Sequence, residues 1–380
     1  MAPDNALELL SCISSDGLLR LTLEAFTPGP LDDDEVLVEI HAAPVHPSDQ
    51  RVLLGPVDTS TLRRVDTATG PSVEGRVPPA AMASVDARLD RKLPVGAEGA
   101  GVVIDAGKRA THLMGRRVGF RTTSGAYATH RVVRADDCIV VDDGVPFAAA
   151  AGAFLNPLTV LCMVRTLRRD GHRALVHAPA ASALGQMLNR LCLADDIGLV
   201  NVVRSPAQVA LLEGQGATHV VDSSAPDFVA RLDDAIAATG ATAAFDAIGG
   251  GTMASTMLAS MERAQRARMT AFSPYGSPVL KQVYSYGLLD PSPRVIGLDV
   301  GTAWSIRGWL MAWELAALDS DTVTGFRTRI AQDLASIFAT DYKAALGFDA
   351  LLTPAALQAM ALRSTQSKVL VEPNGPAGSA

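Results

Sequence analysis

From residue 148 onward, short apolar runs alternate with segments of helix length, and this alternation constrains the fold more than any other feature. Strands are predicted over residues 174–177, 199–203, 218–221, 243–247, 269–272 and 295–298, with helices over 184–193 and 206–215. Strands that alternate with helices indicate parallel strands joined by crossover helices. The second part of the chain is therefore predicted to be a doubly wound α/β domain.

The first part of the chain has a different texture. Residues 36–40, 99–104, 117–120 and 127–133 have a β-strand pattern interrupted by glycines, which favours a barrel-like domain. Residues 368–372 predict a last strand that returns to this domain. The stretch 56–94 is rich in Pro, Gly and Ala, and we expect a long loop or partly helical lid that influences substrate choice.

Composition excludes several classes of protein. With 48% hydrophobic and 19% charged residues, the 380-residue chain can bury large cores. Its net charge of -7 gives no electrostatic basis for binding nucleic acid. No apolar run reaches transmembrane length, and the first residues show no signal-peptide pattern. Four scattered cysteines suit a reducing compartment. We expect a cytoplasmic protein with a small-molecule substrate and neither a nucleic-acid nor a membrane partner.

The turn after the first strand of the α/β part has the place and composition of a phosphate-binding turn. Its sequence is HAPAASALG, from His177 to Gly185. Small residues there let backbone N–H groups and the helix N-terminus approach a pyrophosphate. Because only Gly185 matches the usual glycine pattern, a tightly packed turn that binds nothing is the alternative.

The next strand, LVNVVR, ends in Arg204, which lies 19 residues after Gly185. This spacing suits the residue that contacts the adenosine ribose. A guanidinium there can pair with a 2′-phosphate, whereas NAD-selective folds carry an acidic residue, and here no acid occurs before Glu213. The sequence therefore predicts NADP(H) in preference to NAD(H), with a solvent-exposed arginine as the alternative.

Several segments together resemble the medium-chain dehydrogenase/reductase superfamily. They are VLVEIHAAPVHPSD, VGAEGAGVV, GRRVGF, SGAYATHRVV, FLNPLTV and SKVLVEP. The resemblance is to the zinc-free quinone oxidoreductase and enoyl reductase branch. It implies a GroES-like β-barrel catalytic domain over residues 1–150 and 325–380. It also implies a Rossmann dinucleotide-binding domain over residues 151–324.

The positions of the zinc ligands in this superfamily argue against a metal. The zinc-dependent members need a Cys and a His where this chain has His46 and Ala97, and Asn156 is near the third position. A catalytic zinc requires three protein ligands and an open position. We therefore expect no zinc.

The resemblance implies an NADPH-dependent reductase of enones, enals, enoyl thioesters or quinones. An alcohol or ketone dehydrogenase, and a nucleotide-binding protein without turnover, are the alternatives. The resemblance also implies a homodimer, for which we expect the apolar edge 293–301 to be the interface. The residues implied to contact the cofactor are Asn156, Ala181, Ser182, Ala183, Leu184, Gly185, Arg204, Ser205, Tyr275, Gly276, Trp309 and Lys368.

Reduction of an α,β-unsaturated carbonyl develops negative charge on the carbonyl oxygen, so hydrogen-bond donors and a proton source are needed. Enoyl reductases of this branch use a tyrosine in the loop after the NPSD-like segment, but the corresponding loop, QRVLLGPVDTSTLRR, has none. His46, Ser48 and Tyr127 are the candidate donors. Each has a structural alternative: a hydrogen bond to the backbone, a turn cap and aromatic packing.

Overall fold

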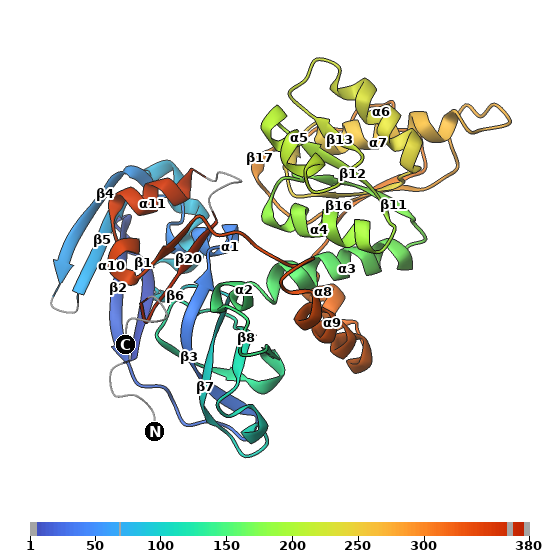
Figure 1. Cartoon of the computed structure of the whole chain (residues 1–380). Helices are drawn as coiled ribbons and strands as arrows, with labels where there is room; N and C mark the ends of the chain where they lie inside the picture. The colour runs from blue at the N-terminus through green and yellow to red at the C-terminus, as the bar shows by residue number, and fades with distance from the viewer. Residues whose placement is uncertain (1–5, 68–69, 363–367, 376–380) are drawn as a thin grey trace. The chain divides into compact units, whose positions relative to one another are not determined.

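The computed structural model describes residues 6–67, 70–362 and 368–375. The chain forms two compact units (Figure 1). Unit 1 comprises residues 1–155, 330–335 and 339–380, and unit 2 comprises residues 156–329 and 336–338. No helix within the described ranges is long and apolar enough to span a membrane.

Unit 1 is built from two β-sheets. One has the strand order β4-β5-β2-β1-β6, and the other has the order β10-β8-β7-β3-β20-β19, with β9 also paired to β3. The strands are β1 Ala6–Ile13, β2 Leu18–Phe26, β3 Glu35–Pro44, β4 Asp58–Thr67, β5 Gly70–Arg76, β6 Leu93–Pro94, β7 Glu98–Ala106, β8 Arg117–Arg121, β9 His130–Arg134, β10 Cys138–Val140, β19 Ala344–Leu346 and β20 Val369–Val371. The helices are α1 Pro47–Leu53, α2 Phe147–Ala151, α10 Phe348–Leu351 and α11 Pro354–Ala361. The predicted return of the last strand is confirmed, because β20 pairs antiparallel with β3.

The prediction of a loop or helical lid over residues 56–94 is wrong. Strands β4 and β5 pair antiparallel, and β5 pairs with β2, so these residues extend a sheet. Short 3-10 helices at Pro79–Ser84 and Asp86–Arg88 follow it. Both strands are largely polar, with Leu62 and Val73 as their buried apolar side chains, so neither has the apolar alternation that predicts a strand.

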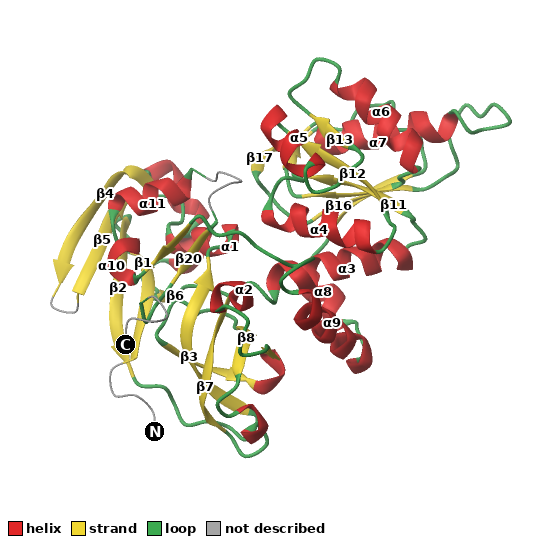
Figure 2. Ribbon diagram, viewed as in Figure 1, coloured by secondary structure: helices red, strands yellow, loops and turns green. Residues whose placement is uncertain are grey.

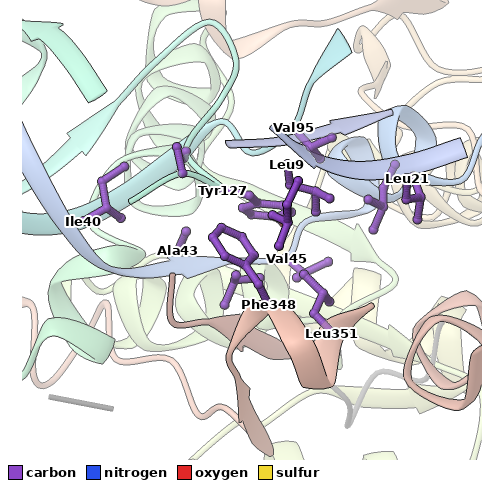
Figure 3. Packing of buried hydrophobic residues seen from close by; sticks show 14 of the residues in the cluster. Leu9, Leu21, Ile40, Ala43, Val45, Val95, Tyr127, Phe348 and Leu351 are labelled. Carbon is purple, nitrogen blue, oxygen red and sulfur yellow. The ribbon is translucent and has the colours of Figure 1, made fainter. Parts of the chain in front are cut away.

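The core of unit 1 forms where the two sheets and the C-terminal helices meet. Figure 3 shows the ring of Tyr127 among apolar side chains that include Leu9, Val45 and Phe348. Tyr127 is fully buried and packs directly on Gly96, which has a positive φ of 95°. A side chain at Gly96 would collide with the ring, so the glycine is required both for its backbone conformation and for this contact.

Unit 2 contains a six-stranded parallel sheet with the order β13-β12-β11-β14-β16-β18, which confirms the doubly wound prediction. Helices α6 and α7 lie on one side of it, and α3 and α4 lie on the other (Figure 2). The strands are β11 Ala174–Ala178, β12 Gly198–Val203, β13 Val220–Asp222, β14 Ala243–Asp246, β16 Lys281–Ser285 and β18 Trp304–Gly308, with a small pair β15 Gly249–Gly251 and β17 Asp290–Arg294. The helices are α3 Leu155–Arg169, which begins at the last residue of unit 1, α4 Ala183–Ala194, α5 Pro206–Glu213, α6 Phe228–Thr239, α7 Met253–Arg266, α8 Met311–Ala316 and α9 Ser320–Asp333.

Two strand predictions in unit 2 are wrong. Residues 269–272 and 295–298 are irregular, and the fifth and sixth strands are β16 and β18. Both predictions rested on short apolar runs, but Phe272 and Leu298 are exposed. The strands that form instead carry polar residues such as Lys281 and Gln282.

One polar residue of β16 is buried with a partner. Lys281 forms an ion pair with Glu262 of α7, and both side chains are almost completely inaccessible to solvent. The other oxygen of Glu262 accepts a hydrogen bond from the backbone N–H of Ser277, at 2.9 Å. The carboxylate also lies directly against Gly276 and Gly301, where any side chain would collide with it. This pair fixes the loop before β16 to helix α7.

Candidate active site

In unit 2, the turn between β11 and α4 lies where the sequence predicts a phosphate-binding turn. Ser182 caps α4: its hydroxyl accepts a hydrogen bond from Gly185 N at 3.0 Å and donates to Pro179 O at 3.0 Å. Gly185 packs against the backbone of Ala180, where a side chain would not fit. The serine side chain is thus folded back onto the turn and leaves the outer surface of Ser182, Ala183 and Leu184 partly accessible.

Gly185 and Ser182 fulfil the requirements of a turn that binds a pyrophosphate. The last glycine of a dinucleotide turn permits close helix–strand packing, and Gly185 does this. The second glycine allows the ligand to approach the backbone, and Ser182 allows it here because its side chain points inward. Ala181 is buried and supports the turn. The residues present therefore fit a dinucleotide.

Arg204 follows β12 immediately, as predicted. Its side chain is exposed, and none of the ion pairs in the described ranges involves it. Its backbone N–H is held by Gln208 Oε1 at 3.0 Å. Ser205 is the N-cap residue of α5 and makes no side-chain capping hydrogen bond. The guanidinium is accordingly free to meet an anionic ligand.

Two further predicted cofactor residues of unit 2, Asn156 and Trp309, are less accessible than Arg204. Asn156 is the second residue of α3 and is half-buried. Trp309 follows β18, is buried, and donates its indole N–H to Thr166 Oγ1 at 3.0 Å. Its position at the carboxyl end of a strand agrees with the prediction, but its N–H is already used for packing.

Tyr275 and Gly276, which the resemblance implies as cofactor contacts, lie away from the carboxyl ends of the strands. Both residues precede β16, and Tyr275 is 71% exposed. Ligands of doubly wound sheets bind at the carboxyl ends of strands, whereas these residues come before the amino end of theirs. The residue that follows the carboxyl end is Tyr286, which the misplaced fifth strand concealed.

Tyr286 closes a small polar cluster at the carboxyl ends of β11 and β14. Its hydroxyl lies 2.8 Å from Nε2 of His177, and its backbone N–H donates to Asp246 O at 2.9 Å. Burial lowers the pKa of His177 to about 3, so the imidazole is neutral at physiological pH. Burial also raises the pKa of Asp246, although two backbone N–H groups counteract this.

In unit 1, the predicted catalytic residue His46 lies in a buried polar cluster. It is the N-cap residue of α1, directly after β3, and its backbone N–H donates to Asp49 Oδ2 at 2.9 Å. Its Nε2 lies 2.5 Å from Oε1 of Glu98, a carboxylate that is completely buried. The second oxygen of Glu98 accepts from the backbone N–H groups of Phe154 and Leu155, at 3.0 and 2.8 Å.

The other two predicted catalytic residues differ in accessibility. Ser48 is exposed on α1. The hydroxyl of Tyr127 donates to Pro44 O at 3.2 Å and lies 3.4 Å from Asp49 Oδ2. Burial is the main cause that raises the pKa of Tyr127 and of Asp49. The Tyr127 hydroxyl thus has a structural role beside the cluster, where it contacts Pro44 and Asp49.

The strand order explains why distant residues meet here. Strands β7, β3, β20 and β19 are successive neighbours, and at one end of this row lie the start of β7, the end of β3 and the starts of β20 and β19. Glu98, His46, Lys368 and Tyr342 are at or just beyond these four strand ends. Glu98 and Tyr342 were absent from the predicted site. The VGAEGAGVV motif contained Glu98, but no pattern in the sequence marked Tyr342.

Lys368 thus lies in unit 1, in this cluster. Its ammonium nitrogen lies 5.5 Å from the centre of the Tyr342 ring. Burial lowers the pKa of Lys368, and the nearby carboxylates Glu98 and Asp49 oppose that shift. Among the described residues, no group of three side chains suited to hold a metal ion is found.

Comparison with curated proteins finds quinone oxidoreductases. The chain is 31% identical over 142 residues to a quinone oxidoreductase of Pseudomonas aeruginosa, a match that covers 36% of this chain and 43% of the relative. It is 28% identical over 190 residues to a quinone oxidoreductase of Salmonella typhimurium, covering 49% and 57%. The chain therefore spans about half the length of the curated relatives it matches. No family model matches the chain.

Comparison with solved structures extends over nearly the whole chain. The Escherichia coli quinone oxidoreductase complexed with NADPH matches with a TM-score of 0.65 and 19% identity, covering 96% of this chain and 99% of that one. The CurK enoyl reductase matches with a TM-score of 0.68 and 16% identity, covering 97% and 99%. These structural matches confirm the predicted two-domain fold. The sequence similarity to quinone oxidoreductases agrees with the predicted resemblance.

Proposed function

We propose that this chain, a relative of the quinone oxidoreductases, is an NADPH-dependent reductase of activated carbon–carbon double bonds or quinones that works without zinc. The observation that carries the proposal is the pairing of an open β11–α4 turn with the free, exposed Arg204 at the end of the next strand. An NADPH complex of a protein with the same fold supports it.

In this proposal the turn residues Ser182, Ala183 and Leu184 hold the pyrophosphate. Arg204 and Ser205 meet the 2′-phosphate, and Asn156 and Trp309 contribute to the nicotinamide side. When bound, the nicotinamide supplies a hydride. A guanidinium can pair with phosphate through two parallel hydrogen bonds, which suits Arg204 to this role.

In unit 1, the buried cluster around Glu98 and His46 would contact the substrate. Glu98 holds the imidazole of His46 through a hydrogen bond, so its ring orientation is fixed before a substrate arrives. A fixed imidazole of this kind preorganises the polar wall of the substrate site. Among the predicted donors, His46 belongs to this cluster, Tyr127 supports it and Ser48 is exposed beside it.

A panel of substrates tests the proposal. Purified protein and NADPH are mixed with enones, enoyl thioesters, quinones and simple ketones, and the loss of NADPH absorbance is followed with and without a chelator. We expect turnover of an enone, enoyl thioester or quinone that the chelator does not change. Turnover of simple ketones alone would favour an alcohol dehydrogenase, and no turnover would favour a nucleotide-binding protein. Activity that is lost to the chelator and restored by zinc would contradict zinc independence.

We also propose that the protein is a cytoplasmic homodimer. Strand β18 is an edge strand of the parallel sheet, and Val295 and Leu298, which precede it in the chain, are 54% and 102% exposed. Exposed apolar side chains beside an open sheet edge favour association. Light scattering at micromolar concentration is expected to give twice the chain mass of 39.7 kDa, and Leu298→Arg should give a monomer. A monomeric wild-type protein would contradict this assignment.

A further inference from the structure

Tyr342 is the one tyrosine with a shielded hydroxyl group that has no hydrogen-bond partner among the described residues. The hydroxyl groups of Tyr127, Tyr284 and Tyr286 all contact other protein atoms, and Tyr275 is exposed. Leaving a buried polar group without a partner destabilises the folded state. Such a group is therefore a candidate for completion by a ligand.

A second unpartnered group lies beside it. The ammonium nitrogen of Lys368 is also shielded and makes no hydrogen bond to a described residue. The two side chains are neighbours because β19 and β20 run parallel, with Ala344 opposite Val369 and Lys343 N donating to Lys368 O at 3.0 Å. The ammonium thus lies over the Tyr342 ring and makes a cation–π contact with it.

The same cluster brings Tyr342 close to the Glu98–His46 pair. A Cβ atom built on Gly152 would lie 2.9 Å from the Tyr342 hydroxyl oxygen, and Phe154, two residues on, donates its N–H to Glu98. Burial and the nearby Glu98 raise the pKa of Tyr342. The hydroxyl is therefore protonated at neutral pH and able to donate.

We propose that Tyr342 is the proton donor of the reduction, and that Lys368 is a positioning residue that stabilises the phenolate left after proton transfer. This inference rests on the proposed function. The other predicted donors are occupied or exposed: His46 Nε2 is held by Glu98, the Tyr127 hydroxyl is bonded to Pro44, and Ser48 lies at the surface.

With an unsaturated carbonyl compound as substrate, the reduction adds one hydride and one proton. The hydride from the nicotinamide forms a C–H bond at the β-carbon, and the π electrons move to the carbonyl oxygen to give an enolate. The O–H bond of Tyr342 breaks, its proton passes to the enolate, and its electron pair stays on the phenolate beside Lys368. A proton from water then restores the phenol. For a quinone, the same proton converts the hydroquinone anion to the hydroquinone.

Tyr342→Phe tests the inference through kcat, which should fall, and through the melting temperature, which should not. General acid catalysis contributes typically 10²–10⁴-fold, so kcat is expected to fall at least about 100-fold. The Kd for NADPH should not change. The melting temperature should stay constant or rise, because the variant removes a buried group that has no partner. Tyr284→Phe is the matched control: its hydroxyl is bonded to Asp170 at 2.7 Å, so the melting temperature should fall while kcat stays at the wild-type value.

Lys368→Met provides the second test. If Lys368 acts through Tyr342, the double variant should be hardly slower than Tyr342→Phe alone, which is the mark of two coupled residues. Fully multiplicative losses would overturn the positioning role. Wild-type-like turnover of Tyr342→Phe, or a fall in its melting temperature as large as that of Tyr284→Phe, would overturn the proton-donor role. A wild-type protein that reduces no enone, enoyl thioester or quinone would instead overturn the proposed function, and this inference with it.

Discussion

Glu262→Gln is expected to destabilise the protein by about 3–5 kcal/mol, the usual cost of breaking a buried ion pair. The substitution keeps the shape of the side chain but leaves the ammonium of Lys281 buried without its countercharge. For a unit of this size, that loss corresponds to roughly 6–20 °C in melting temperature. Calorimetry or circular dichroism measures it directly.

The neighbouring residue offers a matched control. Arg263 also forms an ion pair, with Asp233 at 2.7 Å, but its side chain is 40% exposed. Solvent screens such pairs, so Arg263→Gln should cost only about 0–1 kcal/mol. The double replacement of Glu262 by Leu and Lys281 by Met removes both charges and should recover much of the loss. Equal melting temperatures for Glu262→Gln and wild type would contradict a structural role for the pair.

Arg204→Ala should weaken NADPH binding by about 10- to 100-fold, because a hydrogen bond to a charged group contributes roughly 1.5–3 kcal/mol. NADH lacks the 2′-phosphate, so its affinity should stay nearly unchanged. Fluorescence titration of both cofactors with wild type and variant measures the difference. Arg231→Ala, at an exposed position of α6, removes the same charge elsewhere and should leave the affinities for NADPH and NADH unaltered. Wild-type preference for NADH, or equal weakening of both cofactors, would show that Arg204 does not bind the phosphate.

The sequence was sufficient to predict the doubly wound sheet because its first four strands are short, apolar and separated by helices of ordinary length. The prediction failed at the fifth and sixth strands. There the chain places Lys281 in a buried strand and leaves Phe272 and Leu298 exposed, so apolar content alone pointed to the wrong segments. The pairing of β4 with β5 was missed for a related reason, because both strands are largely polar and β5 contains Pro71 and two glycines.

The candidate site was predicted only in part. The β11–α4 turn and Arg204 follow local sequence patterns, and the structure places them as expected. Tyr342 lies in the same cluster as His46 only because β19 pairs with β20 and β20 pairs with β3, across nearly 300 residues of sequence. No local pattern could indicate this contact, because it depends on strand order. Tyr286 was missed because the strand that carries it was misplaced.

The fate of deuterium from NADPH labelled at C4 of the nicotinamide shows whether hydride passes from NADPH to an activated double bond. With an enone as substrate, we expect deuterium on the β-carbon of a saturated ketone, in step with NADPH consumption. Deuterium on the carbinol carbon of an alcohol that keeps its double bond would contradict the proposed function, as would NADPH binding with no transfer of deuterium to any enone or enoyl thioester and no reduction of a quinone.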